Sequence, residues 1–95
     1  MKHFDKVVSA VASAHGLPVE LISSGTRGRK DASWARQVAI YLVARVNPDQ
    51  NMSAIGRAFG RDRTTVRHAI ELVTKRMDDK TRKLEKQLVR TAAAL

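Results

Sequence analysis

Basic and hydroxyl side chains follow one another between residues 61 and 68, where the chain reads RDRTTVRH. An arginine can donate two parallel hydrogen bonds to O6 and N7 of guanine, and a threonine can set its methyl group against thymine. Asp62 can accept hydrogen bonds from backbone amides or from the amino group of cytosine. These side chains are therefore suited to contacts with the edges of base pairs and with phosphates.

Two short helices joined by a tight turn are predicted to carry this run. Ile55, Ala58 and Phe59 are spaced i, i+3, i+4, which would seat a first helix on a core. Gly60 follows where a C-terminal cap is expected, and Asp62 is expected to cap a second helix. The buried stripe of that second helix consists of Val66, Ala69, Ile70 and Val73. Its polar face is left free, as in a helix-turn-helix.

The stretch IGRAFGRDRTTVRHA, residues 55 to 69, resembles the signature of the C-terminal DNA-binding domain of the bacterial replication initiator DnaA, whose pattern runs close to IGxxFGGRDHTTVxHA. Three further segments agree with it. Phe4 to Ile22 resemble the opening helix and connector of that domain, Thr26 to Lys30 its basic loop, and Trp34 to Val46 a helix that the family often writes as RQIAMYLxREL. The similarity covers about residues 3 to 76.

The resemblance implies a compact all-α domain of about five helices, similar to the Trp repressor, that binds double-stranded DNA with sequence specificity. In the family, the aspartate, the histidine and the first threonine of RDHTT read bases in the major groove. Those positions are Asp62, Arg63 and Thr64 here, and Thr65 is a fourth candidate for base contact. The guanidinium at Arg63 favours a guanine contact or a phosphate clamp, so the target can differ from the usual box.

Phosphates are expected to meet cations and helix N-termini. The candidates are Arg36, Gln37, Ser53, Arg61, Arg67 and His68. Arg36 and Gln37 match an RQ pair of the family, and His68 matches a histidine that the family places near the DNA backbone. Ser53 opens the first helix of the motif.

In the family, an arginine of the basic loop enters the minor groove, where narrow A·T tracts attract guanidinium groups. Arg27, Arg29 and Lys30 are the candidates here, and the longer spacing to the next helix leaves all three open. The turn also departs from the family. A single glycine, Gly60, stands where two are common, which predicts a turn one residue shorter that can tilt the second helix.

Charge agrees with a nucleic-acid partner. The 95 residues contain 18 lysines and arginines against 9 acidic residues, a net charge of +9 and a pI near 10.9. Anionic membranes and acidic proteins are further classes that such a charge allows, although double-stranded DNA is the partner we expect, without a membrane or a small-molecule substrate. The absence of cysteine excludes disulfides and thiolate zinc sites. No signal peptide or membrane span is readable, so a cytoplasmic, nucleoid-associated location is expected.

Enzyme motifs are not found in the sequence, which contains no Gly-rich phosphate loop, nucleophile elbow or HExxH. We expect no catalytic residue, cofactor or metal. His68 and Glu71 are spaced as a ligand pair, but they lack a third ligand.

A single domain is expected, with four parts. Residues 1–22 form a first helix that stops by Gly16, with a connector; residues 23–31 form the basic loop; residues 32–76 hold the central helix and the helix-turn-helix; residues 77–95 form a last helix. Trp34 is expected to fill the core or its edge.

Two functions remain open. The first is a stand-alone DNA-binding regulator, without ATPase, of transcription or of replication initiation. The second is a protein-interaction or oligomerisation module that uses the apolar stripe from Leu84 to Leu95 for a homodimer or a partner protein, with only non-specific DNA binding. The same stripe spacing would also simply dock the last helix on the core.

Overall fold

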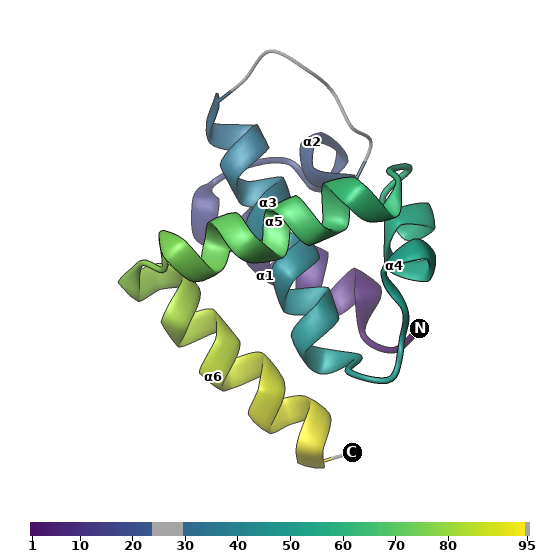
Figure 1. The fold of residues 1–95 in the computed structure, drawn as a ribbon. Helices are drawn as coiled ribbons and strands as arrows, with labels where there is room; N and C mark the ends of the chain where they lie inside the picture. Colours follow the sequence, from purple (N-terminus) through teal and green to yellow (C-terminus); the bar gives the residue numbers. More distant parts are fainter. Residues whose placement is uncertain (24–29, 95) are drawn as a thin grey trace.

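The computed structural model describes residues 1–23 and 30–94, and these residues form helices and connecting turns without a strand (Figure 1). The helices are α1 (Phe4–His15), α2 (Val19–Ser23), α3 (Lys30–Val46), α4 (Met52–Ala58), α5 (Arg63–Lys75) and α6 (Asp79–Ala94). The all-α prediction is confirmed. About five helices were expected, and the sixth is the short α2, which was predicted to be a connector.

The central helix is α3, as its apolar composition predicts. Val38, Ala39, Leu42 and Val43 are fully buried along it, and every other helix packs against it. Figure 1 shows α5 crossing α3 at its middle, with α1 behind and α6 running along its C-terminal half. The burial of about 20 apolar side chains in one cluster makes this helix the scaffold that positions the rest.

The start of α3 differs from the prediction. The basic loop was expected to extend through Asp31, whereas α3 begins at Lys30 and its first turn holds Asp31. Ala32 explains the earlier start, because its side chain is 1 % exposed and extends the buried face by one turn. The polar composition of residues 23–31 is typical of a loop, so the sequence did not indicate that the helix begins before Ala32. Lys30 therefore lies on a helix, and Arg27 and Arg29 lie outside the described residues.

Capping residues end α1 and begin α6. Gly16 has φ 63 after α1, and its N–H donates to the carbonyls of Ala12 and Ser13, which confirms the stop by Gly16. At the start of α6 the Asp78 carboxylate accepts from the Thr81 amide at 2.8 Å. Residue Asp78 is thus the cap and Asp79 the first helical residue.

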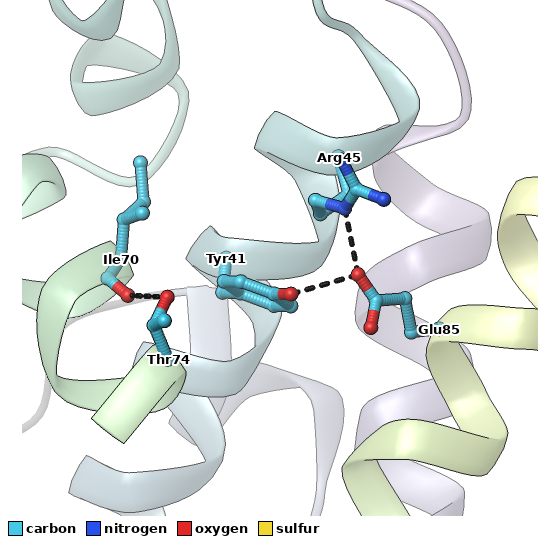
Figure 2. Close-up of polar contacts among 5 residues, drawn as sticks. All are labelled: Tyr41, Arg45, Ile70, Thr74 and Glu85. Carbon is cyan, nitrogen blue, oxygen red and sulfur yellow. Dashed lines mark hydrogen bonds and ion pairs between the residues drawn. The ribbon is translucent and has the colours of Figure 1, made fainter. Parts of the chain in front are cut away.

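The last helix is docked by its apolar stripe. Leu84 and Leu88 are 9 % and 6 % exposed and belong to the core cluster. Figure 2 shows a polar clamp between α6 and α3: the Glu85 carboxylate accepts from the hydroxyl of Tyr41 at 2.7 Å and from Nε of Arg45 at 2.6 Å. An interaction module that used this stripe would have to pull α6 off the domain.

Acid is expected to destabilise the fold through the two aspartate caps. The hydrogen bond from the Thr65 amide lowers the pKa of Asp62. Burial alone would raise the pKa of Asp78, but hydrogen bonds from Thr81 and the nearby His15 outweigh it and lower that pKa. Because the folded pKa values are depressed, the caps stabilise the fold fully above the unfolded value of about 3.9 and lose this effect as the pH falls through the folded values.

The measurement is thermal unfolding followed by circular dichroism from pH 6 down to acid. The double variant Asp62→Asn/Asp78→Asn keeps the capping oxygens and removes the titration, so its melting temperature is expected to fall less steeply with pH. Parallel pH curves for the two proteins would contradict the assignment.

Candidate nucleic-acid interface

The turn between α4 and α5 is built around two glycines. After Ala58 the chain reaches Gly60 at φ 67, whose N–H donates to the carbonyl of Arg57 at 3.2 Å. The Arg61 N–H then donates back to the carbonyl of Gly56 at 2.7 Å. This pair of bonds is a Schellman ending, which requires the left-handed conformation that glycine adopts without strain. The predicted cap at Gly60 is confirmed.

Gly56 has a second, steric role that the sequence did not reveal. A Cβ atom on Gly56 would lie 2.5 Å from the carbonyl oxygen of Arg61 and 3.1 Å from the carbonyl carbon and oxygen of Asp62. All three atoms are backbone, so the turn passes α4 at a distance that only glycine permits. This close approach fixes where α5 begins.

The apolar face of α4 is rotated from the predicted one. Ile55 and Phe59 are buried, each 2 % exposed, and Phe59 packs edge-on against the ring of Phe4 with centroids 4.9 Å apart. Ala58 was expected in this set and is exposed. Gly56 is buried instead, because the turn folds back over it.

The second helix of the motif, α5, has one buried and one polar face. Asp62 is its cap, since the carboxylate accepts from the Thr65 amide at 2.8 Å. The side chains turned inward are Val66, Ala69 and Val73, with Ile70 half-buried. Those turned to solvent are Arg63, Thr64, Arg67 and His68, with Thr65 half-buried. The predicted stripe is confirmed, and the polar residues share the opposite side of α5, the helix that Figure 1 shows crossing in front of α3.

A surface hollow lies at the junction of α4 and α5. Met52, Arg63, Thr64 and Arg67 line it. Met52 is 40 % exposed and was missed by the sequence reasoning, because a single methionine at a helix start carries no periodic signal. Its apolar surface beside two guanidinium groups suits a thymine methyl next to phosphates.

A second surface hollow lies where α5 packs against α3. Its lining residues are Gln37, His68, Glu71, Leu72 and Lys75. Gln37 and His68, both predicted to meet phosphates, are therefore brought together here. Lys75 is an additional cation that sequence reasoning did not select.

Arg36 is placed differently from the other predicted cations. Its side chain is 8 % exposed, and its guanidinium donates to the carbonyl of Leu21 at 2.7 Å and to that of Ile22 at 3.3 Å. Burial lowers the pKa of Arg36, and the nearby charge of Arg61 lowers it further. This guanidinium holds the end of α2 against α3, so we assign it a positioning role beside the turn.

Replacing Arg36 by alanine is expected to lower the free energy of unfolding by about 1.5–3 kcal/mol, because the substitution removes hydrogen bonds made by a charged group at a buried position. Urea unfolding measures the change. Arg57→Ala removes an exposed arginine from α4 and is expected to change stability by less than about 0.5 kcal/mol. Equal effects of the two substitutions would show that the Arg36 hydrogen bonds do not stabilise the fold.

The remaining predicted DNA-contacting residues occupy the rim of this surface. Ser53 is half-buried in the first turn of α4. The cap of α4 is Asn51, whose side-chain oxygen accepts from the Ala54 amide at 2.8 Å. Arg61 is half-buried in the turn, and Lys30 is exposed at the start of α3. Their contacts with DNA stay predictions, as does the tilt expected from the single glycine of the turn.

Neither a metal cluster nor a membrane span is found in the part of the chain that the structure describes. Within residues 1–23 and 30–94, three or more histidine or acidic side chains nowhere gather closely enough to hold a metal ion. Over the same residues, no helix is long and apolar enough to cross a membrane.

Comparison with known proteins gives one family. Residues 4–73 match the model of the bacterial DnaA protein helix-turn-helix. The chain is 41 % identical over 71 residues to the chromosomal replication initiator protein DnaA of Deinococcus radiodurans. The aligned region covers 75 % of this chain and 15 % of that protein. It is 46 % identical over 61 residues to the DnaA of Gluconobacter oxydans, covering 63 % of this chain and 12 % of the relative. The DnaA of Synechocystis sp. is 38 % identical over 71 residues, and the aligned region covers 74 % of this chain and 15 % of that relative.

Proposed function

The chain belongs to the family of the bacterial DnaA helix-turn-helix domain, and from that membership we propose that it binds double-stranded DNA with sequence specificity through α4 and α5. The observation that carries the proposal is the outer face of α5. Arg63, Thr64 and Arg67 are exposed there on a helix whose opposite face is held by the core. A helix positioned in this way can enter the major groove with its first turn against base edges.

Base contacts are assigned to the first turn of α5. Arg63 offers a bidentate pair of donors to guanine, and Thr64 offers a hydroxyl and a methyl group. Asp62 caps the helix with one oxygen and can accept from a cytosine amino group with the other. Thr65 lies half-buried behind them and can meet a base or phosphate through its hydroxyl. The exposed Met52 adds an apolar contact for a thymine methyl.

Phosphate contacts are assigned to the rim of the same surface, where they give affinity and register. The residues are Gln37, Ser53, Arg61, Arg67 and His68, with Lys75 as an addition. Arg36 is assigned a positioning role, because its guanidinium holds the end of α2 against α3 beside the turn. Minor-groove contact is assigned to the basic loop, with Arg27, Arg29 and Lys30 as candidates.

Regulation is the role that we propose for this binding. The chain spans 15 % or less of the length of the three DnaA relatives named above. A DNA-binding domain of this kind can compete for initiator boxes or repress a promoter, in the cytoplasm at the nucleoid. The alternative, an interaction module based on the Leu84–Leu95 stripe, is less supported because Leu84 and Leu88 are buried in the core.

Salt dependence gives a direct test of the binding surface. If about six phosphates are neutralised, the logarithm of the association constant should fall with the logarithm of the salt concentration at a slope near −5. Fluorescence anisotropy with a labelled duplex between about 50 and 300 mM salt measures it. The double variant Arg63→Ala/Arg67→Ala should bind more weakly at every salt concentration. A slope shallower than about −2, or equal binding by the variant, would contradict the proposal.

A further inference from the structure

A second basic surface lies away from the helix-turn-helix. The α3–α6 groove, as we call it, is lined by Arg45, Arg82, Glu85, Lys86, Val89 and Arg90. None of these residues belongs to α4 or α5. In Figure 2, Tyr41 of α3 lies between Thr74 of α5 and Glu85 of α6, so the groove begins on the side of α3 that faces away from α5. The family match ends at residue 73, before α6 begins.

The one acidic side chain of the groove lining is neutralised. The Glu85 carboxylate is 18 % exposed and accepts from Arg45 at 2.6 Å and from the Tyr41 hydroxyl at 2.7 Å. Burial raises the pKa of Tyr41, as do its hydrogen bond to Glu85 and the charge of that carboxylate. Tyr41 therefore stays a neutral donor. Arg82 lies 3.5 Å from Asp79, an exposed and weak pair.

Two cations of the groove are left without a protein partner among the described residues. Lys86 and Arg90 make no hydrogen bond or ion pair with any of these residues. They are four residues apart and hence on the same face of α6, separated by about 6 Å of helix rise. Arg82 precedes them at the same spacing. The groove thus presents a straight row of positive charge with its only carboxylate already engaged.

The chemistry of the groove favours phosphates over protein. Protein interfaces depend on apolar and aromatic anchors at their centre. The groove offers only Val89, which is half-buried, because Leu84 and Leu88 face the core. A second copy of the chain is also a poor partner, since each copy carries a net charge of +9. Phosphate binding needs cations alone and no apolar anchor.

We propose that the α3–α6 groove is a second, sequence-independent binding site for DNA phosphates. It takes the backbone of DNA beyond the segment held by α5, either the flank of the same duplex or a second duplex. The proposal rests on the proposed function of α5, which brings DNA to the molecule. Bound in this way, the domain would contact more DNA than its recognition sequence, and on two duplexes it would bridge them.

The test compares two double variants of the full chain that remove equal charge. Lys86→Ser/Arg90→Ser empties the groove, and Lys80→Ser/Lys83→Ser removes two exposed cations of α6 that do not line it. Binding is measured on a duplex of about 12 base pairs and on one of about 40 that contains the same central sequence. The long duplex offers more non-specific sites, which alone raise the affinity by a statistical factor. Wild type should bind the long duplex more tightly than this factor explains, and the groove variant should lose the additional gain in affinity. Its salt slope on the long duplex should be shallower by about 1 for each phosphate that the groove no longer neutralises.

Each outcome decides between the proposals. If both variants lost the length-dependent gain in affinity to the same extent, the gain would depend on net charge alone, and the groove site would be overturned. The groove site would also be overturned if the groove variant kept the gain. Failure of wild type to bind the short duplex would overturn the proposed function of α5 instead. A pull-down of labelled duplex by protein held on a second, immobilised duplex separates the two sources of phosphate: capture by wild type but not by the groove variant identifies bridging, and its absence identifies the flank.

Discussion

Replacing Gly56 by alanine is expected to abolish sequence-specific DNA binding and to lower the free energy of unfolding by about 1–3 kcal/mol, the range seen when atoms are forced into a packed site. The added Cβ would stand 2.5 Å from the carbonyl oxygen of Arg61 and 3.1 Å from two backbone atoms of Asp62. Backbone cannot rotate aside as a flexible side chain can. The turn must move, and with it the cap and the first turn of α5.

The measurement pairs urea unfolding with anisotropy titration of a specific and a scrambled duplex. Gly60→Ala is the matched control, because Gly60 also belongs to the turn but a Cβ there meets no atom within 4 Å. Its cost is the strain of φ 67 on a side chain, about 1–2 kcal/mol, without a steric push on α5. We expect this control to be destabilised and still to prefer the specific duplex. Specific binding by Gly56→Ala would show that the close approach is not required.

Replacing Arg63 by alanine is expected to relax recognition at one base pair while leaving the other positions read. A bidentate arginine–guanine contact discriminates by about 1–3 kcal/mol, or roughly 5- to 150-fold between the correct and the wrong base. Arg63 is exposed in the first turn of α5 and forms no part of the core, so the fold should be unaffected. Competition among four duplexes that differ at that base pair measures the loss.

Arg67→Ala provides the comparison for that result. Arg67 lies one turn further along the same face, and if it holds a phosphate, its removal should weaken binding to all four duplexes alike and make the salt slope shallower by about 1. If Arg63→Ala behaved as Arg67→Ala is expected to, Arg63 would be a phosphate clamp and the specificity would belong to other side chains.

Local sequence signals were enough for most of the helix-turn-helix. Gly60 and Asp62 work through bonds to residues within five positions of themselves, so their roles can be predicted from spacing alone. The buried stripe of α5 follows from its 3.6-residue period in the same way. The polar face opposite the stripe is then determined, which is why the exposed candidates on α5 could be named in advance.

Most of the features that the sequence did not reveal depend on packing between elements. Arg36 was selected as a basic residue near a helix start, but its partners lie 14 and 15 residues away at the end of α2, and only the packing of α2 on α3 reveals them. Gly56 received no role from the sequence, because its neighbour, the Arg61 carbonyl, approaches only when the turn closes. Ala58 and Lys30 were misplaced for a related reason, since short helices shift their buried face and their ends to suit the core.

Selection of bound duplexes from a random double-stranded library, at roughly 150 mM salt to suppress non-specific binding, tests the central claim most directly. The wild-type chain and Arg63→Ala are run in parallel. Sequence-specific recognition by α5 predicts one enriched motif for wild type and the same motif for the variant, relaxed at a single position. Binding without an enriched motif, or a motif that the variant leaves unchanged, would contradict the claim and leave the family membership as a statement about fold alone.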